Sequence, residues 1–172
     1  IAPDRLDALA EIAETALNEC DVVLITAGSS ASTRDITADV INNLGAPGVL
    51  VHGINTRPGK PTILGICRGK AVIGLPGNPV SALVNGLLFV VPLIKRLTLQ
   101  PEVSPQPTVK AILTNNIPSQ AGREDWQPVK LVCSESGWMA EPVFGKSNLI
   151  FSLSAADGLL CVPADSTGFG AG

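Results

Sequence analysis

Three polar loops mix small residues with a few charged ones, and each of them follows a short apolar run. Their sequences are AGSSASTRD at 27–35, NTRPGKP at 55–61 and LPGNPVS at 75–81. Small residues allow backbone N–H groups to approach a ligand, and hydroxyl and basic side chains bind anionic oxygens. This composition favours a site for a phosphorylated or otherwise anionic molecule.

The loop at 27–35 leads into a helical pattern at 35–45, so its last residues lie where unpaired backbone N–H groups favour anions. Asp35 is either a reactive carboxylate there or the N-cap or a first-turn carboxylate of its helix. The loop lacks the lysine of a nucleoside-triphosphatase loop and the third glycine of a dinucleotide-binding loop. The candidate binding residues that it supplies are Gly28, Ser29, Ser30, Ser32, Thr33 and Arg34.

The loop at 55–61 holds one lysine between two prolines. Pro58 and Pro61 restrict the backbone and would keep Lys60 pointing in one direction. Gly59 is expected to adopt a positive φ, which glycine tolerates. The alternative interpretation is an ordinary turn with an exposed lysine.

The third loop is typical of a junction between a strand and a helix. Pro76 and Gly77 suit a tight turn, while Asn78 is placed as the helix N-cap. Pro79 suits the first helical position, and Ser81 should expose its hydroxyl in the first turn. Backbone N–H groups at this helix start would face the same ligand as the other loops, although capping and turn chemistry alone also explain the sequence.

Apolar periodicity places these loops within an α/β fold. The first two expected strands, with the helix between them, make a βαβ unit with a right-handed crossover. The last two form a hairpin that turns at Arg68 and Gly69. Because ligands bind at the carboxyl ends of strands in such sheets, the three loops should converge. The expected strands lie at 21–26, 48–53, 62–66 and 71–75, and the expected helices at 4–20, 35–45 and 79–97.

The sequence predicts two domains joined by a linker. The segment TLQPEVSPQP combines three prolines with polar residues and no periodicity, which is typical of a semi-rigid linker. Short β-prone runs after it, among them LIFSL and LLCVP, predict a small all-β barrel or sandwich. We place an α/β domain at 1–99, the linker at 100–107 and the β domain at 108–172.

Composition and charge narrow the classes of function. Of 172 residues, 45% are hydrophobic and 3% aromatic, and the formal net charge is −3. An acidic chain with few aromatic side chains is a poor binder of nucleic acid. Between Arg34 and Lys70, however, five basic residues outnumber two acids, so that stretch carries +3 and the remainder −6. The stretch could receive an anionic ligand, or it could be a solvated face.

Four widely spaced cysteines include no CxxC pair, and each lies in or beside an apolar segment. We expect reduced thiols that act as small core residues, which favours a cytoplasmic protein. They are Cys20, Cys67, Cys133 and Cys161.

The single histidine and the length of the apolar stretch argue against two kinds of catalytic or metal site and against a membrane span. His52 is the only histidine, which argues against a His-rich metal site and against a Ser-His-Asp triad. The strongest apolar stretch is interrupted by Asn85 and Pro92, and it falls short of the roughly 20 residues that a membrane span needs. We therefore expect no association with a membrane.

Taken together, the motifs resemble those of a known family. The runs DVVLITAGSSASTRD, VHGINTRPGKPTILG, AVIGLPGNPVSALV, AGREDWQPVKL and GKSNLIFSLSAADGLLCVP have the order and spacing of the molybdopterin molybdenumtransferases. These MoeA-like proteins include the C-terminal part of gephyrin. PGKP followed by GLPGNPVSA at this separation is specific, and the resemblance covers nearly the whole chain. It implies a three-layer α/β molybdopterin-binding domain, similar to the adenylyltransferase that makes the substrate.

The resemblance also implies an activity and a set of site residues. Members of the family insert molybdate into adenylylated molybdopterin, release AMP and form molybdenum cofactor, with a divalent cation that is usually Mg²⁺. By position, Asp35 would be the catalytic and metal-binding acid, and Lys60 the catalytic lysine of the PGKP loop. The family further implies a homodimer and contact with a molybdopterin adenylyltransferase. The substrate-binding turns would comprise Gly59, Pro76, Gly77, Asn78, Pro79 and Ser81.

Departures from the family pattern keep alternatives open. The first loop is GSSASTRD where the family has GGVSxGxxD, and this form is also similar to the adenylyltransferases. A pterin-binding or peptide-binding scaffold and a sensor of molybdate or the pterin are further alternatives. The chain starts at Ile1 without the family's N-terminal regions, so a fragment with little activity of its own is expected. Arg123, after Gly122, is expected to be a turn residue that pairs with a nearby acid.

Overall fold

The computed structural model describes residues 5–26, 31–99, 107–135, 137–143 and 151–172. The chain divides into two compact units, the first made of 1–54 and 59–82 and the second of 55–58 and 83–172. Residues 100–106 of the predicted linker lie outside the described residues. The domain limits 1–99 and 108–172 stay a prediction, and the two units differ from them in assigning 55–58 and 83–99 to the second unit.

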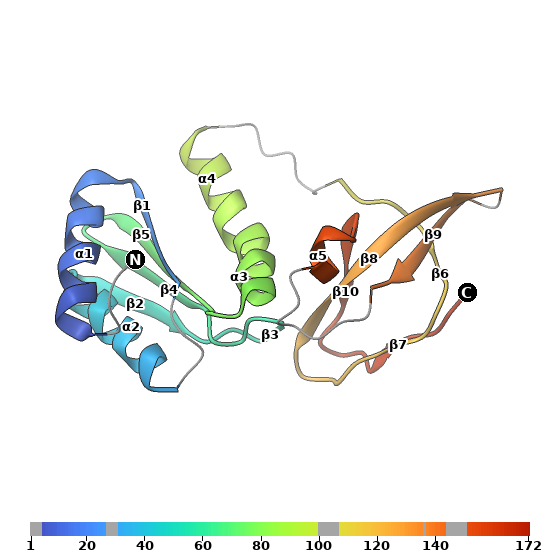
Figure 1. Ribbon diagram of the computed structural model, residues 1–172, viewed down its shortest axis with the longest axis horizontal. Coiled ribbons are helices and arrows are strands. Elements are labelled where there is room, and N and C mark those ends of the chain that lie inside the picture. The colour runs from blue at the N-terminus through green and yellow to red at the C-terminus, as the bar shows by residue number, and fades with distance from the viewer. Residues whose placement is uncertain (1–4, 27–30, 100–106, 136, 144–150) are drawn as a thin grey trace. The chain divides into compact units, whose positions relative to one another are not determined.

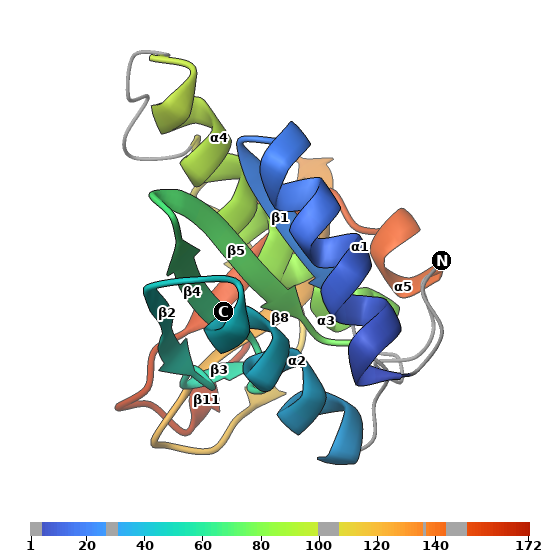
Figure 2. The same cartoon turned by 90° about the vertical axis from the view of Figure 1, so that its left-hand side faces the viewer.

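The first unit is built on a mixed four-stranded sheet. Its elements are α1 (Leu6–Glu19), β1 (Val22–Thr26), α2 (Ala31–Asn43), β2 (Pro47–His52), β4 (Ile63–Cys67), β5 (Lys70–Leu75) and the start of α3 (Pro79–Asn85). The strand order is β1-β5-β4-β2. Helices α1 and α2 cover the same face of this sheet (Figure 1), and Figure 2 views that face.

The β4–β5 hairpin lies between the two strands of the predicted βαβ unit. β1 is parallel to β5, whereas β4 is antiparallel to both β5 and β2. Strands β1 and β2 therefore run in the same direction but form opposite edges of the sheet. The hairpin turns at Arg68 and Gly69, as expected, with φ of 52° and 78°. Positive φ at both central residues is the signature of the tight turn that matches strand twist.

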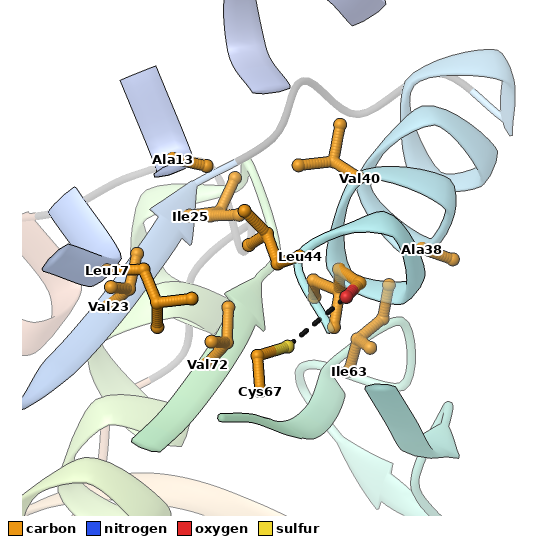
Figure 3. Close-up of a cluster of buried hydrophobic side chains, with 11 residues drawn as sticks. Ala13, Leu17, Val23, Ile25, Ala38, Val40, Leu44, Ile63, Cys67 and Val72 are labelled. Carbon is orange, nitrogen blue, oxygen red and sulfur yellow. Dashed lines mark hydrogen bonds between the residues drawn. The ribbon is translucent and has the colours of Figure 1, made fainter. Parts of the chain in front are cut away.

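The apolar residues of α1 and α2 pack against the sheet to form the core of the first unit (Figure 3). Every second residue of β1 faces the helices, which explains why Val23 and Ile25 are buried while Leu24 is 45% exposed. The buried members of this core are Ala13, Leu17, Val23, Ile25, Ala38, Val40, Ile41, Leu44, Ile63, Cys67 and Val72. Burial of these apolar side chains, at about 25 cal/mol per Å² of apolar area, is the main contribution to the stability of the first unit.

The four cysteines are all free thiols, but they differ in exposure. Burial raises the pKa of the Cys67 and Cys161 thiols, and Cys67 Sγ donates to Ile41 O at 3.2 Å (Figure 3). Cys20 and Cys133 are exposed, so the prediction of core positions is wrong for these two. Cys20 follows the last residue of α1, and Cys133 lies in an exposed stretch of a strand end, where neighbouring apolar residues do not imply burial.

The second unit contains a five-stranded sheet and a separate two-stranded one. In the larger sheet the order is β10-β8-β9-β6, with β3 paired to β8, and β11 pairs with β7. A small core of Leu113, Ile117, Val129, Ala140 and Val162 lies within this unit. The strands are β3 (Thr56–Arg57), β6 (Ile112–Leu113), β7 (Ile117–Pro118), β8 (Glu124–Ser134), β9 (Gly137–Pro142), β10 (Gly158–Val162) and β11 (Gly168–Phe169).

One predicted strand of the second unit is wrong. The run LIFSL ends in a one-turn helix, α5 (Phe151–Ser154), which is followed by a bond from Ala156 N to Leu153 O. A short apolar run does not by itself distinguish a strand from a helical turn, and here the Ser and Ala residues that follow allow the turn.

A continuous helix follows the third loop. It consists of α3, a π-helical turn η1 (Gly86–Val90) and α4 (Val91–Leu97). Pro92 stands in the first turn of α4, where a missing N–H is tolerated, so the helix continues through Pro92 and agrees with the helix predicted at 79–97. The 19 residues of Pro79–Leu97 are long and apolar enough to cross a membrane, judged by length and composition alone. One such helix is weak support for a membrane span, since core helices of soluble proteins can have the same length and composition.

Candidate functional site

The three loops singled out in the sequence leave the sheet at one edge. β1 and β5 are parallel neighbours, and two antiparallel steps from β5 through β4 give β2 the same direction. The carboxyl ends of all three strands therefore lie at the same edge of the sheet, as expected, while the convergence of the three loops on one ligand stays a prediction. With about 4.8 Å between strands, the ends of β5 and β2 are about 10 Å apart. A ligand of nucleotide or pterin size can span that distance.

The first loop is described only from its helical part. Gly28, Ser29 and Ser30 lie outside the described residues. Ser32, Thr33, Arg34 and Asp35 belong to α2, and their side chains lie outside the description. The binding and catalytic roles of these residues stay predictions.

The position of Asp35 within α2 corrects one alternative. The helix begins at Ala31, and no acidic residue stands in its first turn. Asp35 is therefore neither the N-cap nor a first-turn carboxylate. Ala31 and Arg34 are good helix formers, so the helix extends further toward its N-terminus than the apolar periodicity indicated.

The second loop is closed by its own backbone and by one buried threonine. Thr62 is fully buried, and its hydroxyl donates to Gly59 O at 2.9 Å. Gly59 has φ of 107°, as expected from its position in the turn. The backbone bonds are Gly53 N to Thr62 O (2.9 Å), Ile54 N to Lys60 O (2.9 Å) and Thr62 N to Gly59 O (3.1 Å). This loop therefore has one well-defined backbone conformation.

Lys60 lies exposed on this loop. The +3 stretch contains four basic residues whose side chains the structure describes, and Lys60 is the one among them without a hydrogen bond or ion pair. Its charge is thus available to a ligand. The other three are engaged in Arg57 Nη1 to Asp125 Oδ2 (3.3 Å), Arg68 Nη1 to Glu14 Oε1 (2.7 Å) and Lys70 Nζ to Leu17 O (2.7 Å). Three of the four described basic residues of the stretch therefore have partners within the protein, which neither the ligand-binding nor the solvated-face interpretation anticipated.

The third loop forms the helix start that the sequence predicts. Asn78 Oδ1 accepts the backbone N–H of Ser81 at 3.2 Å, and α3 begins at Pro79. Asn78 is therefore the N-cap. Gly77 is exposed beside it, whereas Pro76 is buried.

The expected exposure of Ser81 is wrong. Its residue is 7% exposed, and its hydroxyl donates to Asn78 Oδ1 at 3.4 Å. The side chain turns back toward the cap because a hydroxyl at the third helical position lies close to the capping oxygen. Ser81 thus orients Asn78, and a direct contact with substrate stays a prediction.

Two further candidates are also placed. His52 is exposed at the end of β2. Arg123 Nη2 donates to the Gln120 amide oxygen at 3.5 Å, and within the described part of the chain it forms no ion pair with an acid, which corrects the expected pairing. Over the same described residues, no group of three His, Cys, Asp or Glu could hold a metal ion. Thr62 was not anticipated, because a threonine after a proline has no distinctive sequence signal.

Two protein families match successive parts of the chain. Residues 1–96 match the family described as "Probable molybdopterin binding domain", and residues 110–172 match "MoeA C-terminal region (domain IV)". The chain belongs to the MoeA-like family. In this MoeA-like chain, the three polar loops all lie within the matched molybdopterin-binding domain.

Curated relatives of this MoeA-like chain carry related names. A molybdopterin biosynthesis protein of Methanocaldococcus jannaschii is 36% identical over 98% of this chain and 39% of its own length. A molybdopterin molybdenumtransferase of Staphylococcus aureus is 29% identical over 98% of this chain and 40% of its own length. The chain thus spans about 40% of these relatives.

Solved structures show the same fold. The molybdopterin biosynthesis MoeA protein of Pyrococcus horikoshii matches with a TM-score of 0.80 and 38% identity, over 99% of this chain and 40% of that protein. A molybdenum cofactor biosynthesis protein of Pyrococcus furiosus matches with a TM-score of 0.77 and 30% identity, over 100% of this chain and 54% of that protein. A mixed α/β domain followed by the MoeA C-terminal domain is therefore the architecture of this chain.

Proposed function

We propose that the full-length protein inserts molybdate into adenylylated molybdopterin and releases AMP, as a step of molybdenum cofactor biosynthesis. The observation that carries this proposal is an exposed, unpaired Lys60 on a fixed loop, at the sheet edge where two helices begin. A fixed cation and helix N-termini at one edge suit a phosphorylated substrate. The match to the MoeA C-terminal region supports the transferase over a stand-alone adenylyltransferase.

The chain's residues take distinct roles in this proposal. Lys60 neutralises the phosphate charge that develops when the link to AMP is broken, and backbone N–H groups near Gly77 and Asn78 bind substrate oxygens. Asp35 holds a Mg²⁺ ion or orients molybdate. The described residues contain no three-ligand cluster, and Mg²⁺ commonly takes one or two protein carboxylates together with substrate phosphates. A single protein carboxylate such as that of Asp35 fits this pattern, and the ion would supply charge neutralisation.

The test measures molybdate-dependent release of AMP from adenylylated molybdopterin by the full-length protein. We expect Lys60→Ala and Asp35→Ala each to lower the rate about 100-fold, in line with the loss of one group that stabilises developing charge. Lys130→Ala, which removes an exposed lysine on β8, is the matched control and should leave the rate within about twofold. Normal activity of both site variants would contradict the assignment. ATP-dependent adenylation of molybdopterin, with no molybdate-dependent release of AMP, would instead support the adenylyltransferase.

We also propose that the protein is a cytoplasmic homodimer, supplied with substrate by a molybdopterin adenylyltransferase. Support for the dimer comes from an apolar stripe on the helix after the third loop, formed by Leu83 (48% exposed), Leu87 (50%), Val91 (37%) and Ile94 (46%). Their spacing of three and four residues places them on one face. Sedimentation of the full-length protein should give a dimer, and Leu87→Glu should shift it toward the monomer. A monomer at all concentrations would contradict this proposal.

A further inference from the structure

Asp125 is a buried carboxylate to which the proposed reaction assigns no role. It lies on β8, and its side chain has no exposed surface. Three donors reach its two oxygens: Gln127 Nε2 at 2.9 Å, Ser119 Oγ at 3.0 Å and Arg57 Nη1 at 3.3 Å. A carboxylate removed from water requires such partners, so these bonds hold the three donors in place around it.

Arg57 differs from the other two donors in its origin. Ser119 and Gln127 lie six and two residues from Asp125 in the sequence, whereas Arg57 lies 68 residues away. It also belongs to the loop that carries Lys60. The ion pair therefore ties this loop to a strand that is remote in the sequence.

The backbone next to this ion pair is held by a minimal strand. β3 consists of Thr56 and Arg57 and pairs in parallel with β8 (Figure 1). Glu124 N also donates to Asn55 O at 3.0 Å. Thr56 is 8% exposed, and its hydroxyl has no hydrogen-bond partner among the residues that the structure describes. Burying that hydroxyl is unfavourable, so a strand this short depends on the Arg57–Asp125 pair to stay in place.

We propose that Asp125 is a positioning residue, which fixes Arg57 and thereby the start of the turn that presents Lys60. Pro58 follows Arg57 directly, and its carbonyl accepts a bond from Asn85 Nδ2 at 3.2 Å. With the chain held at these two points, little backbone freedom remains before Lys60. The catalytic consequence rests on the proposed function, whereas the structural link does not.

Amide hydrogen exchange in the full chain tests the link without reference to activity. Asp125→Asn and Arg57→Gln should each speed exchange at Ile54 and Thr62, the closing amides of the loop, about tenfold. Ser119→Ala is the matched control, because it removes a bond to the same Asp125 oxygen but none to the loop; it should change these rates less than about twofold. Arg57→Lys keeps the charge and should restore most of the protection.

The pattern across variants decides the inference. In the double variant Arg57→Gln/Asp125→Asn, the amides of Ile54 and Thr62 should exchange no faster than in either single variant, because both changes remove the same ion pair. If Ser119→Ala opened the loop as much as Arg57→Gln did, or if Arg57→Gln left it closed, the inference would be overturned. Arg57→Gln retains a soluble fold even if Asp125→Asn does not, because the Arg57 side chain is 49% exposed.

The assay for AMP release then separates this inference from the proposed function. Asp125 has no exposed surface and cannot touch substrate. A positioning role therefore predicts a raised KM and a lowered kcat in Asp125→Asn. Arg57→Lys should change KM and kcat less than Arg57→Gln does. Faster exchange at the loop together with unchanged AMP release would keep the link and refute the role of Lys60. Unchanged exchange would refute the link whatever the rate of AMP release.

Discussion

The loops after β2 and β5 leave the same sheet edge but are held in place by partners at different distances in the sequence. The cap of the β5 loop joins Asn78 to Ser81, three residues away. The β2 loop is closed by short-range bonds from Thr62 to Gly59 and also tied to Asn85 and Asp125, which lie 27 and 68 residues from their partners. The β5 loop is a local structure, whereas the β2 loop also depends on tertiary contacts. A site that combines both has one wall set by a few neighbouring residues and one set by tertiary structure.

The largest effect in this comparison is expected from Gly59→Ala in the β2 loop. Gly59 has φ of 107°, a conformation that alanine adopts only with strain. We expect the free energy of unfolding to fall by about 1–3 kcal/mol, measured by urea denaturation. Gly158→Ala on β10 is the control, since that glycine has no positive φ and nothing within 4 Å of an added Cβ. Equal effects of the two changes would show that the turn is not held in the conformation described.

Thr62→Val is expected to have the next largest effect. It replaces the fully buried hydroxyl that donates to Gly59 O by a methyl group of similar size. The free energy of unfolding should fall by about 1–2 kcal/mol, and amide exchange should rise at Ile54 as well as at Thr62. Thr15→Val, which alters an exposed hydroxyl on α1, should cost less than about 0.5 kcal/mol. An exchange effect confined to Thr62 itself would argue that the β2 loop is as local as the β5 loop.

Asn78→Ala should have the smallest effect of the three. It removes the capping oxygen for Ser81, and loss of such a cap typically lowers the free energy of unfolding by about 1 kcal/mol. Faster amide exchange should be confined to the first turn of α3. Asn78→Asp keeps the oxygen and should retain most of the stability. Faster exchange in the β2 loop after Asn78→Ala would break the comparison, because the two loops would then be coupled.

The sequence was sufficient for features whose cause lies within a few residues. The Asn78-Pro79 helix start, the positive φ of Gly59 and the hairpin turn at Arg68 and Gly69 each depend on local backbone chemistry, and all three were predicted. The core face of α2 followed from its apolar spacing. The order of strands did not, because periodicity identifies a strand without stating which neighbours it has.

Features whose partners lie far apart in the sequence were missed. Nothing in the residues around Thr56 indicates a strand, since its partner on β8 lies 68 positions away. The engagement of Arg57, Arg68 and Lys70 was equally hidden, so the basic stretch looked more available to a ligand than it is. A count of charges along a sequence does not show which charged side chains form ion pairs or hydrogen bonds with residues elsewhere in the fold.

The insertion of the β4–β5 hairpin between β1 and β2 has a consequence for the order of folding. Cys67 pairs with Lys70 in the hairpin, whereas Val22 of β1 pairs with Ala71, so the hairpin closes a far shorter loop than β1 does. Both edge strands need the hairpin as a template, and we expect the rate-limiting step to form it before β1 joins. Val72→Ala should then slow folding, while Val23→Ala should mainly speed unfolding, as stopped-flow kinetics can measure. Equal slowing of folding by both would mean that the sheet assembles as a whole.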